Sequence, residues 1–222
     1  ISRWEEIRVE RLERSGIEMF AVGGYPADCT NLGVHSLFDG RPDLVVSGVN
    51  IGLNSGLGFF LSSGTIGAAM EGWIAGVPAL AFSVGLQGND RDWKRTVAAP
   101  ESRDMWERAA ALALEITRTI SERGLPAEAD LLSVNFPVGA GPETPRVLTE
   151  LAAVGYQRLF RRKSEGVFVH DYGGELRNEA EAHADTDVAA LRKGRVSITP
   201  VRLAHTAEIS LESRRALEGS SD

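Results

Sequence analysis

The sequence predicts an α/β domain with a mostly parallel sheet and helices on both of its faces. One indication is the continuous apolar run from Ala79 to Val84, which is typical of a strand buried on both sides of a parallel sheet. Another is the stripe of apolar residues from Ile66 to Val77, which recurs at helical spacing directly before that run. The alternation of strands and helices in this part of the chain is the βαβ order of doubly wound folds.

The other elements follow from the same periodicities. The helical stripe turns Ile66, Met70 and Ile74 inward, and the glycines on its other face are small enough to pack closely on a sheet. Gly76 and Pro78 end this helix. Further strands are predicted around residues 7–12, 19–22, 44–47, 131–136 and 195–201, and further helices around 28–39 (with Asp28 as the N-cap), 101–123 and 207–217.

Composition changes after residue 158. The stretch 159–187 is rich in charged residues and glycine, and it is too long to be a simple loop of a compact domain. We therefore predict an α/β core over 1–158, an extended hairpin arm over 159–187, and a returning strand and C-terminal helix over 188–222. The chain starts at Ile1 rather than methionine, and we expect one βα unit to precede it.

Composition and charge restrict the class of function. The net charge of -7 argues against a nucleic-acid-binding surface, which needs a basic stripe, but a nucleotide substrate needs only a few local donors. No apolar run reaches the ~18 residues of a membrane span. The single cysteine, Cys29, cannot form an internal disulfide and fits a reducing compartment. We expect a cytoplasmic protein that binds neither nucleic acid nor membrane.

The segment between the strand at 44–47 and the helical stripe carries the residues that could do chemistry. Asn50 and Asn54 stand among glycines and offer amide oxygens to a hard cation such as Mg²⁺ or Mn²⁺. Ser63, Gly64 and Thr65 begin the helix, where free N–H groups and the helix dipole favour phosphate.

Each of these residues also has a structural interpretation. Ser63 can be an N-cap, and the two asparagines can be turn residues. Their clustering between a buried strand and a buried helix favours an anion site with part of a metal site. The segment lacks the lysine and the spacing of a nucleoside-triphosphate P-loop, and it is not the dinucleotide-binding G-x-G-x-x-G.

These residues resemble a known family, SurE (survival protein E), over roughly residues 17 to 207. The central motif reads RPDLVVSGVNIGLNSG at 41–56 and SGTIGAAMEG at 63–72. Shorter pieces agree in the same order: PADC at 26–29, GVPALAFS at 76–83, SVNFP at 133–137, TDVAAL at 186–191 and VSITP at 196–200.

The resemblance implies a Rossmann-like three-layer domain with a C-terminal β-hairpin extension, exchanged between the subunits of a homodimer or homotetramer. It also implies a metal-dependent 5′/3′-nucleotidase that hydrolyses nucleoside monophosphates to nucleoside and phosphate with Mg²⁺ or Mn²⁺. Asn50 would be a metal ligand, and Asn54, Ser63, Gly64 and Thr65 would form the catalytic site that faces the phosphate. The expected mechanism is metal-assisted hydrolysis, with these donors stabilising the developing charge.

The sequence departs from the family pattern in two places. The family's metal is also held by a serine and an Asp-Asp pair, and no such pair occurs here, so we expect it to be encoded upstream of Ile1. The loop at 57–62 is also unusual. Two alternatives stay open: a non-catalytic nucleotide-binding homologue that lacks the acidic pair, and a phosphatase of broader specificity, including an exopolyphosphatase.

Overall fold

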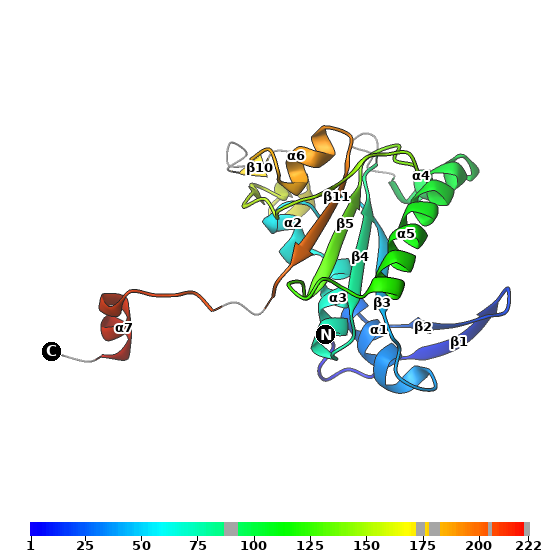
Figure 1. Cartoon of the computed structure of the whole chain (residues 1–222), viewed down its shortest axis with the longest axis horizontal. Helices are drawn as coiled ribbons and strands as arrows, with labels where there is room; N and C mark the ends of the chain where they lie inside the picture. Colours follow the sequence, from blue (N-terminus) through cyan, green and yellow to red (C-terminus); the bar gives the residue numbers. More distant parts are fainter. Residues whose placement is uncertain (87–92, 172–175, 178–182, 204–205, 220–222) are drawn as a thin grey trace.

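The computed structural model describes residues 1–86, 93–171, 176–177, 183–203 and 206–219, and within them a five-stranded sheet forms the centre of the domain (Figure 1). β3, β4 and β5 run parallel, β11 runs antiparallel to β5, and β6 runs parallel to β11. The predicted α/β sheet is therefore confirmed. Its strands, in spatial order, are β3 (Val45–Ile51), β4 (Ala79–Val84), β5 (Leu131–Phe136), β11 (Val196–Val201) and β6 (Arg146–Leu148).

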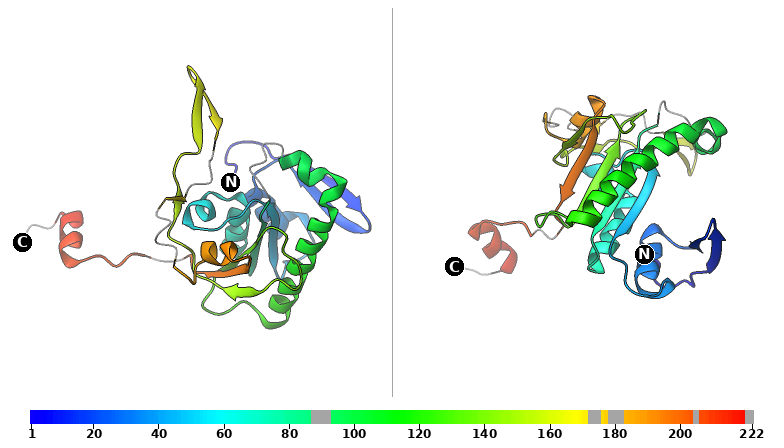
Figure 2. Two further views of the ribbon diagram at one scale, coloured as in Figure 1. Left: turned by 90° about the horizontal axis from the view of Figure 1, so that it is seen from above. Right: turned by 45° about the vertical axis from the view of Figure 1, so that its right-hand side comes forward.

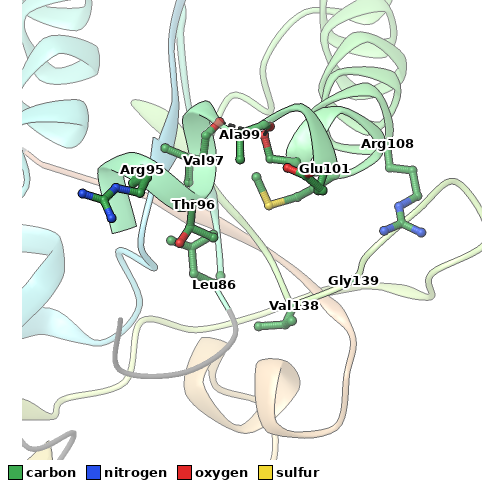
Figure 3. Close-up of a pocket in the computed structure, with 12 residues that line it drawn as sticks. Leu86, Arg95, Thr96, Val97, Ala99, Glu101, Arg108, Val138 and Gly139 are labelled. Atoms are coloured by element: carbon green, nitrogen blue, oxygen red, sulfur yellow. Dashed lines mark hydrogen bonds between the residues drawn. The ribbon is translucent and has the colours of Figure 1, made fainter. Parts of the chain in front are cut away.

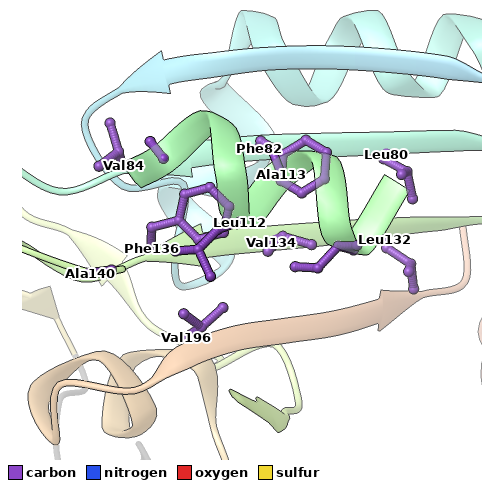
Figure 4. Packing of buried hydrophobic residues seen from close by; sticks show 12 residues of the cluster. Leu80, Phe82, Val84, Leu112, Ala113, Leu132, Val134, Phe136, Ala140 and Val196 are labelled. Atoms are coloured by element: carbon purple, nitrogen blue, oxygen red, sulfur yellow. The ribbon is translucent and has the colours of Figure 1, made fainter. Parts of the chain in front are cut away.

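Helices cover both faces of this sheet, which gives three layers (Figures 1 and 2). α5 (Arg103–Arg123) lies along one face and α3 (Gly64–Ile74) along the other. Burial of large apolar side chains on both faces stabilises the arrangement, because each removes apolar surface from water. On the α5 face the core includes Leu80, Phe82, Leu112, Val134 and Phe136 (Figure 4); on the α3 face it includes Phe60, Ile66, Ala69, Ala81 and Leu131.

The alternation of side chains along β4 and β5 decides which layer each of them meets. Phe82 and Phe136 belong to the α5 core, whereas Ala81 and Leu131 belong to the α3 core. By the same alternation, Ser83 of β4 and Asn135 of β5 fall on the α3 face, and they are register partners in the parallel ladder. Two buried polar side chains therefore stand side by side near the carboxyl ends of the central strands.

Two antiparallel hairpins lie outside this sheet. β1 (Val9–Arg14) pairs with β2 (Ile17–Val22), and β8 (Phe160–Ser164) pairs with β9 (Val167–His170) in a hairpin that stands away from the sheet (Figure 2). The second hairpin falls in the segment predicted as an arm, while the division into three segments stays a prediction. No helix in the described residues is both long and apolar enough to span a membrane.

The remaining elements are short. One of them, the C-terminal helix α7, lies away from the sheet (Figure 1). They are α1 (Pro26–Leu32) with the π-helix η1 (Gly33–Leu37), α2 (Leu57–Ser62), α4 (Trp93–Ala98), the 3-10 helix η2 (Pro100–Ser102), β7 (Gly155–Tyr156), β10 (Leu176–Arg177), α6 (Asp187–Arg192) and α7 (Leu211–Glu218).

Three local predictions are wrong. Tyr25, and not Asp28, is the N-cap of α1; Asp28 lies inside the helix and accepts a hydrogen bond from the Tyr25 N–H at 2.8 Å. The stretch predicted as a loop up to residue 62 contains the helix α2. Ile74, predicted to face inward, is 67% exposed, because α3 turns its Gly72 face toward Val45 of β3.

Two glycines of α3 test how this helix packs. A Cβ on Gly72 would lie 2.9 Å from Val45 Cβ, whereas a Cβ on Gly67 would meet nothing within 4 Å. Gly72→Ala is expected to lower the free energy of unfolding by about 1–3 kcal/mol through overpacking. Gly67→Ala is expected to raise it by up to about 1 kcal/mol, because alanine favours the helix. Urea unfolding measures both, and equal effects would contradict this orientation of α3.

Candidate active site

The candidate site lies at the carboxyl edge of the parallel strands, where open α/β sheets bind their ligands. β3 ends there, and α3 runs back from it: Gly72 packs on Val45 at the start of β3, so Gly64 at the start of α3 lies toward the end of β3. The fold therefore brings Asn50, Asn54 and the first residues of α3 to the same edge.

Asn50 is the half-buried residue just before the end of β3. Its Nδ2 donates a hydrogen bond to the Gly52 carbonyl oxygen at 2.7 Å, and the same nitrogen lies 3.5 Å from Asn54 Oδ1. Asn50 Oδ1 accepts no hydrogen bond within the described part of the chain. Because the amide nitrogen is held and the oxygen is not, Asn50 presents a neutral oxygen to a ligand, as its predicted metal-binding role requires.

Asn54 is buried and fixed at two atoms. Its backbone N–H donates to Asn135 Oδ1 at 2.8 Å, and its Nδ2 donates to Ser83 Oγ at 2.6 Å. The Asn54 side chain therefore turns its carbonyl oxygen, rather than an N–H donor, toward Asn50. An oxygen in this place suits a cation or a water molecule better than a phosphate oxygen, and the phosphate contact of Asn54 stays a prediction.

Ser63 is the N-cap of α3. Its Oγ accepts hydrogen bonds from the N–H groups of Thr65 at 3.1 Å and Ile66 at 3.2 Å, so its structural interpretation is confirmed. The Gly64 N–H and the Thr65 hydroxyl donate to no group among the residues that the structure describes. These two donors stand at the positive end of the helix dipole, where they can meet an anion.

Three buried side chains that sequence reasoning did not assign to the site hold its loop. Ser83 and Asn135 contact Asn54 as described above, and Asp187 binds the loop from α6. The sequence carries a signal for the first two, because each is a polar residue in a strand of mostly apolar residues. For Asp187 the sequence offered only a threonine and an aspartate at a helix start, which is also an ordinary capping pattern.

Asp187 accepts three backbone N–H groups. Its Oδ2 accepts from Gly56 at 2.7 Å, and its Oδ1 accepts from Ala152 at 3.0 Å and Val188 at 2.8 Å. Burial raises the pKa of this carboxyl group above its ordinary value, and the backbone donors partly oppose that shift. Asp187 thus joins the glycine-rich loop, the segment before β7 and the start of α6.

The described residues do not complete a divalent-metal site. No three His, Cys, Asp or Glu side chains gather among them into a group that could hold an ion. Mg²⁺ takes several oxygen ligands and usually at least one carboxylate. Asn50 supplies one neutral oxygen. This oxygen fits as one ligand of such an ion, and further ligands would be needed to bind it.

A cavity of about 580 Å³ opens beyond the ends of β4 and β5 on the α5 side (Figure 3). Leu86, Val97 and Met105 supply apolar surface, and Glu101 and Arg108 add charged groups. Neither Asn135 nor Ser83 lines this cavity, and no residue of the glycine-rich loop does.

The fold and this edge define a class of protein: a three-layer α/β protein with a glycine-rich strand-to-helix loop at the carboxyl edge of its sheet. Residues 1–164 match the family model described as Survival protein SurE, and the chain belongs to this family. The predicted family and its three-layer fold are thereby confirmed.

Known relatives agree in sequence and in structure. The 5'-nucleotidase SurE of Methanosarcina mazei is 37% identical over 215 residues, which cover 94% of this chain and 78% of the relative. The 5'-nucleotidase SurE 1 of Thermus thermophilus is 41% identical over 203 residues, which cover 90% and 72%. The crystal structure of the SurE protein from Aquifex aeolicus matches with a TM-score of 0.71 at 28% identity, covering 98% of this chain and 82% of that one.

Proposed function

We propose that this chain is a 5′-nucleotidase that hydrolyses nucleoside 5′(3′)-monophosphates to nucleoside and phosphate. The observation that carries the proposal is the place of Asn50, Asn54 and the start of α3 at one edge of the sheet, where the Gly64 N–H and the Thr65 hydroxyl have no partner among the described residues. The Methanosarcina and Thermus relatives are named 5'-nucleotidase SurE and 5'-nucleotidase SurE 1, which supports this activity over a non-catalytic homologue or a broader phosphatase.

The start of α3 would bind the phosphate group of the substrate. The Gly64 N–H and the Thr65 hydroxyl supply two donors, and the dipole of an eleven-residue helix adds a favourable field. Donors that meet the charge developing on phosphoryl oxygens stabilise the transition state, and removal of one such donor typically costs about 10²–10³ in rate. The Ser63 hydroxyl contributes indirectly, because it caps the helix that carries these donors.

A divalent cation, Mg²⁺ or Mn²⁺, is part of the proposal. Asn50 Oδ1 would be one of its ligands, since this oxygen is held in place through the hydrogen bond from Asn50 Nδ2 to Gly52. The other ligands would come from outside the residues that the structure describes.

The β8–β9 hairpin supports a further part of the proposal, a homodimer or homotetramer. It exposes Phe160 (57%) and Phe168 (59%) on strands that stand away from the sheet (Figure 2). Contact with a second copy of the chain would remove these rings from water. The substrate is a small molecule rather than a nucleic acid or a membrane, and the single cysteine supports the cytoplasm as the location.

The activity and its metal requirement are tested together. The protein is expected to release phosphate from adenosine monophosphate with Mn²⁺ or Mg²⁺, and chelation is expected to lower the rate by at least about 10²-fold, because such ions contribute several kcal/mol to phosphoryl transfer. A colorimetric phosphate assay measures both, and re-addition of the metal is expected to restore the rate. Both the 222-residue chain and the complete product of its gene are assayed.

The same assay separates the alternatives. Binding of adenosine monophosphate without phosphate release by either protein would contradict the proposal and indicate a non-catalytic homologue. Equal kcat/KM values for adenosine monophosphate, p-nitrophenyl phosphate and tripolyphosphate would instead indicate a phosphatase of broad specificity.

A further inference from the structure

Asn135 is an unusual residue for its place in the fold. It lies in the central strand β5, where every residue is buried, and it is itself 1% exposed. Its register partners on the two neighbouring strands are Ser83 and Ser197. A small hydroxyl side chain would therefore fit this position, and the larger amide needs a separate explanation.

The contacts of Asn135 point to the glycine-rich loop. Its Oδ1 accepts the backbone N–H of Asn54 at 2.8 Å, across 81 residues of sequence, while the side chain of Asn54 is held by Ser83. The loop around Asn54 turns at Gly52 and Gly56, which adopt positive φ angles of 101° and 73° that glycine reaches without strain. Val84 holds the loop at Gly52 and Asp187 holds it at Gly56, and Asn135 fixes the Asn54 backbone between these two points.

The amide nitrogen of Asn135 does not contribute to the stability of the fold. Its Nδ2 is buried and has no hydrogen-bond partner among the described residues. Rotating the amide would not help, because it would turn an N–H donor toward the Asn54 N–H. An unpaired buried donor lowers stability, so each such group in a native protein needs an explanation, and a role in a functional site is one of them.

We propose that Asn135 is a positioning residue of the nucleotidase site, acting through Asn54 and not through contact with the substrate. Its carbonyl oxygen fixes the Asn54 backbone, and this sets where the Asn54 Oδ1 stands beside Asn50. The inference rests on the proposed function, because it assigns Asn135 a role in that same site. A misplacement of catalytic groups by about 1 Å can cost about 10²-fold in rate, so the effect of losing this contact is measurable.

Two substitutions of Asn135 and one control make the test. Asn135→Ser removes the Oδ1 that accepts the Asn54 N–H, leaves a hydroxyl on a shorter side chain, and places in β5 the residue that both neighbouring strands carry at this level. Asn135→Asp keeps an oxygen that can accept the Asn54 N–H. Ser133→Ala is the matched control, since Ser133 is buried on the same face of β5. Every residue of the glycine-rich loop is described by the structure, and Ser133 makes no hydrogen bond to any of them.

We expect Asn135→Ser to lower kcat for adenosine monophosphate by about 10–100-fold and to change KM by less than about threefold. Asn135→Asp is expected to recover at least about half of that loss on a logarithmic scale, and Ser133→Ala to leave kcat within about twofold of the parent. Independently of activity, hydrogen exchange at the Asn54 amide is expected to be faster in Asn135→Ser than in the parent or in Ser133→Ala.

Either of two results overturns the inference: Asn135→Ser with the kcat of the Ser133→Ala control, or unchanged exchange at the Asn54 amide in Asn135→Ser. A parent protein that releases no phosphate would contradict the proposed function instead, and the exchange measurement would still decide whether Asn135 fixes the loop.

Discussion

Replacing Asn50 by alanine is expected to lower kcat/KM for adenosine monophosphate by at least about 10²–10³-fold. The substitution removes Oδ1, the free oxygen assigned to the metal, together with the Nδ2 donor that holds it against Gly52. Losses of this order follow the removal of one group that stabilises developing charge in a transition state. Steady-state kinetics at several Mn²⁺ concentrations measure the effect, and a raised metal requirement would separate lost affinity from lost turnover.

Two further variants sharpen this prediction. Asn50→Asp keeps an oxygen but turns a carboxylate toward the Gly52 carbonyl oxygen, so it is also expected to lose most of the activity. Asn31→Ala removes another half-buried asparagine, which donates to Glu71 at 2.7 Å between α1 and α3, and it is expected to keep the parent's kcat/KM within about threefold. Full activity of Asn50→Ala would refute the assignment of this residue.

Replacing Asp187 by alanine is expected to lower the free energy of unfolding by about 2–5 kcal/mol. The side chain accepts the N–H groups of Gly56, Ala152 and Val188, and its removal leaves buried donors unsatisfied at a cost of about 1–3 kcal/mol each. Urea unfolding measures the change. Asp185→Ala, at an exposed position two residues earlier, is expected to stay within about 0.5 kcal/mol of the parent, and equal losses in the two variants would contradict the account.

The pKa of Asp187 gives this prediction a pH dependence. Because burial raises the pKa above the ordinary value of 3.8, the folded chain holds this proton to higher pH than the unfolded chain. The stabilising contribution from protonation is complete below pH 3.8 and is lost as pH rises through the folded pKa. The free energy of unfolding of the parent relative to Asp187→Asn is therefore expected to fall as pH rises through that window, and a rise would contradict the direction of the shift.

The sequence predicts the central strands well because their apolar pattern comes from burial on both faces of the sheet. The bounds of β4 and β5 agree with the predicted ranges, since each is a mostly apolar run that is buried between two layers. The helix α2 was missed because its stability comes from contacts distant in sequence. Phe60 is buried in the α3 core, and the Phe59 ring lies 5.1 Å from that of Tyr156, which no local pattern in a glycine-rich stretch indicates.

The sequence predicts the residues of the candidate site but not the buried side chains that hold them in place. Asn50, Asn54 and the start of α3 are close in sequence, so one motif could indicate all of them. The donors and acceptors that fix them come from Ser83, Asn135 and Asp187, at separations of up to 131 residues. Hydrogen-bond pairing across such distances depends on strand order and register, which residue spacing alone does not determine.

The hydrogen bond from the Gly56 N–H to Asp187 also affects the order in which parts of the domain fold during synthesis. A nascent chain that has emerged only through β5 already holds β3, α3, β4 and the Asn54–Asn135 contact, but it lacks the carboxylate that fixes Gly56. Closing a contact over 131 residues is slow relative to local structure, because the entropy of a long loop must be lost first. We therefore expect the glycine-rich loop to reach its final shape among the last parts of the domain, only after α6 has docked.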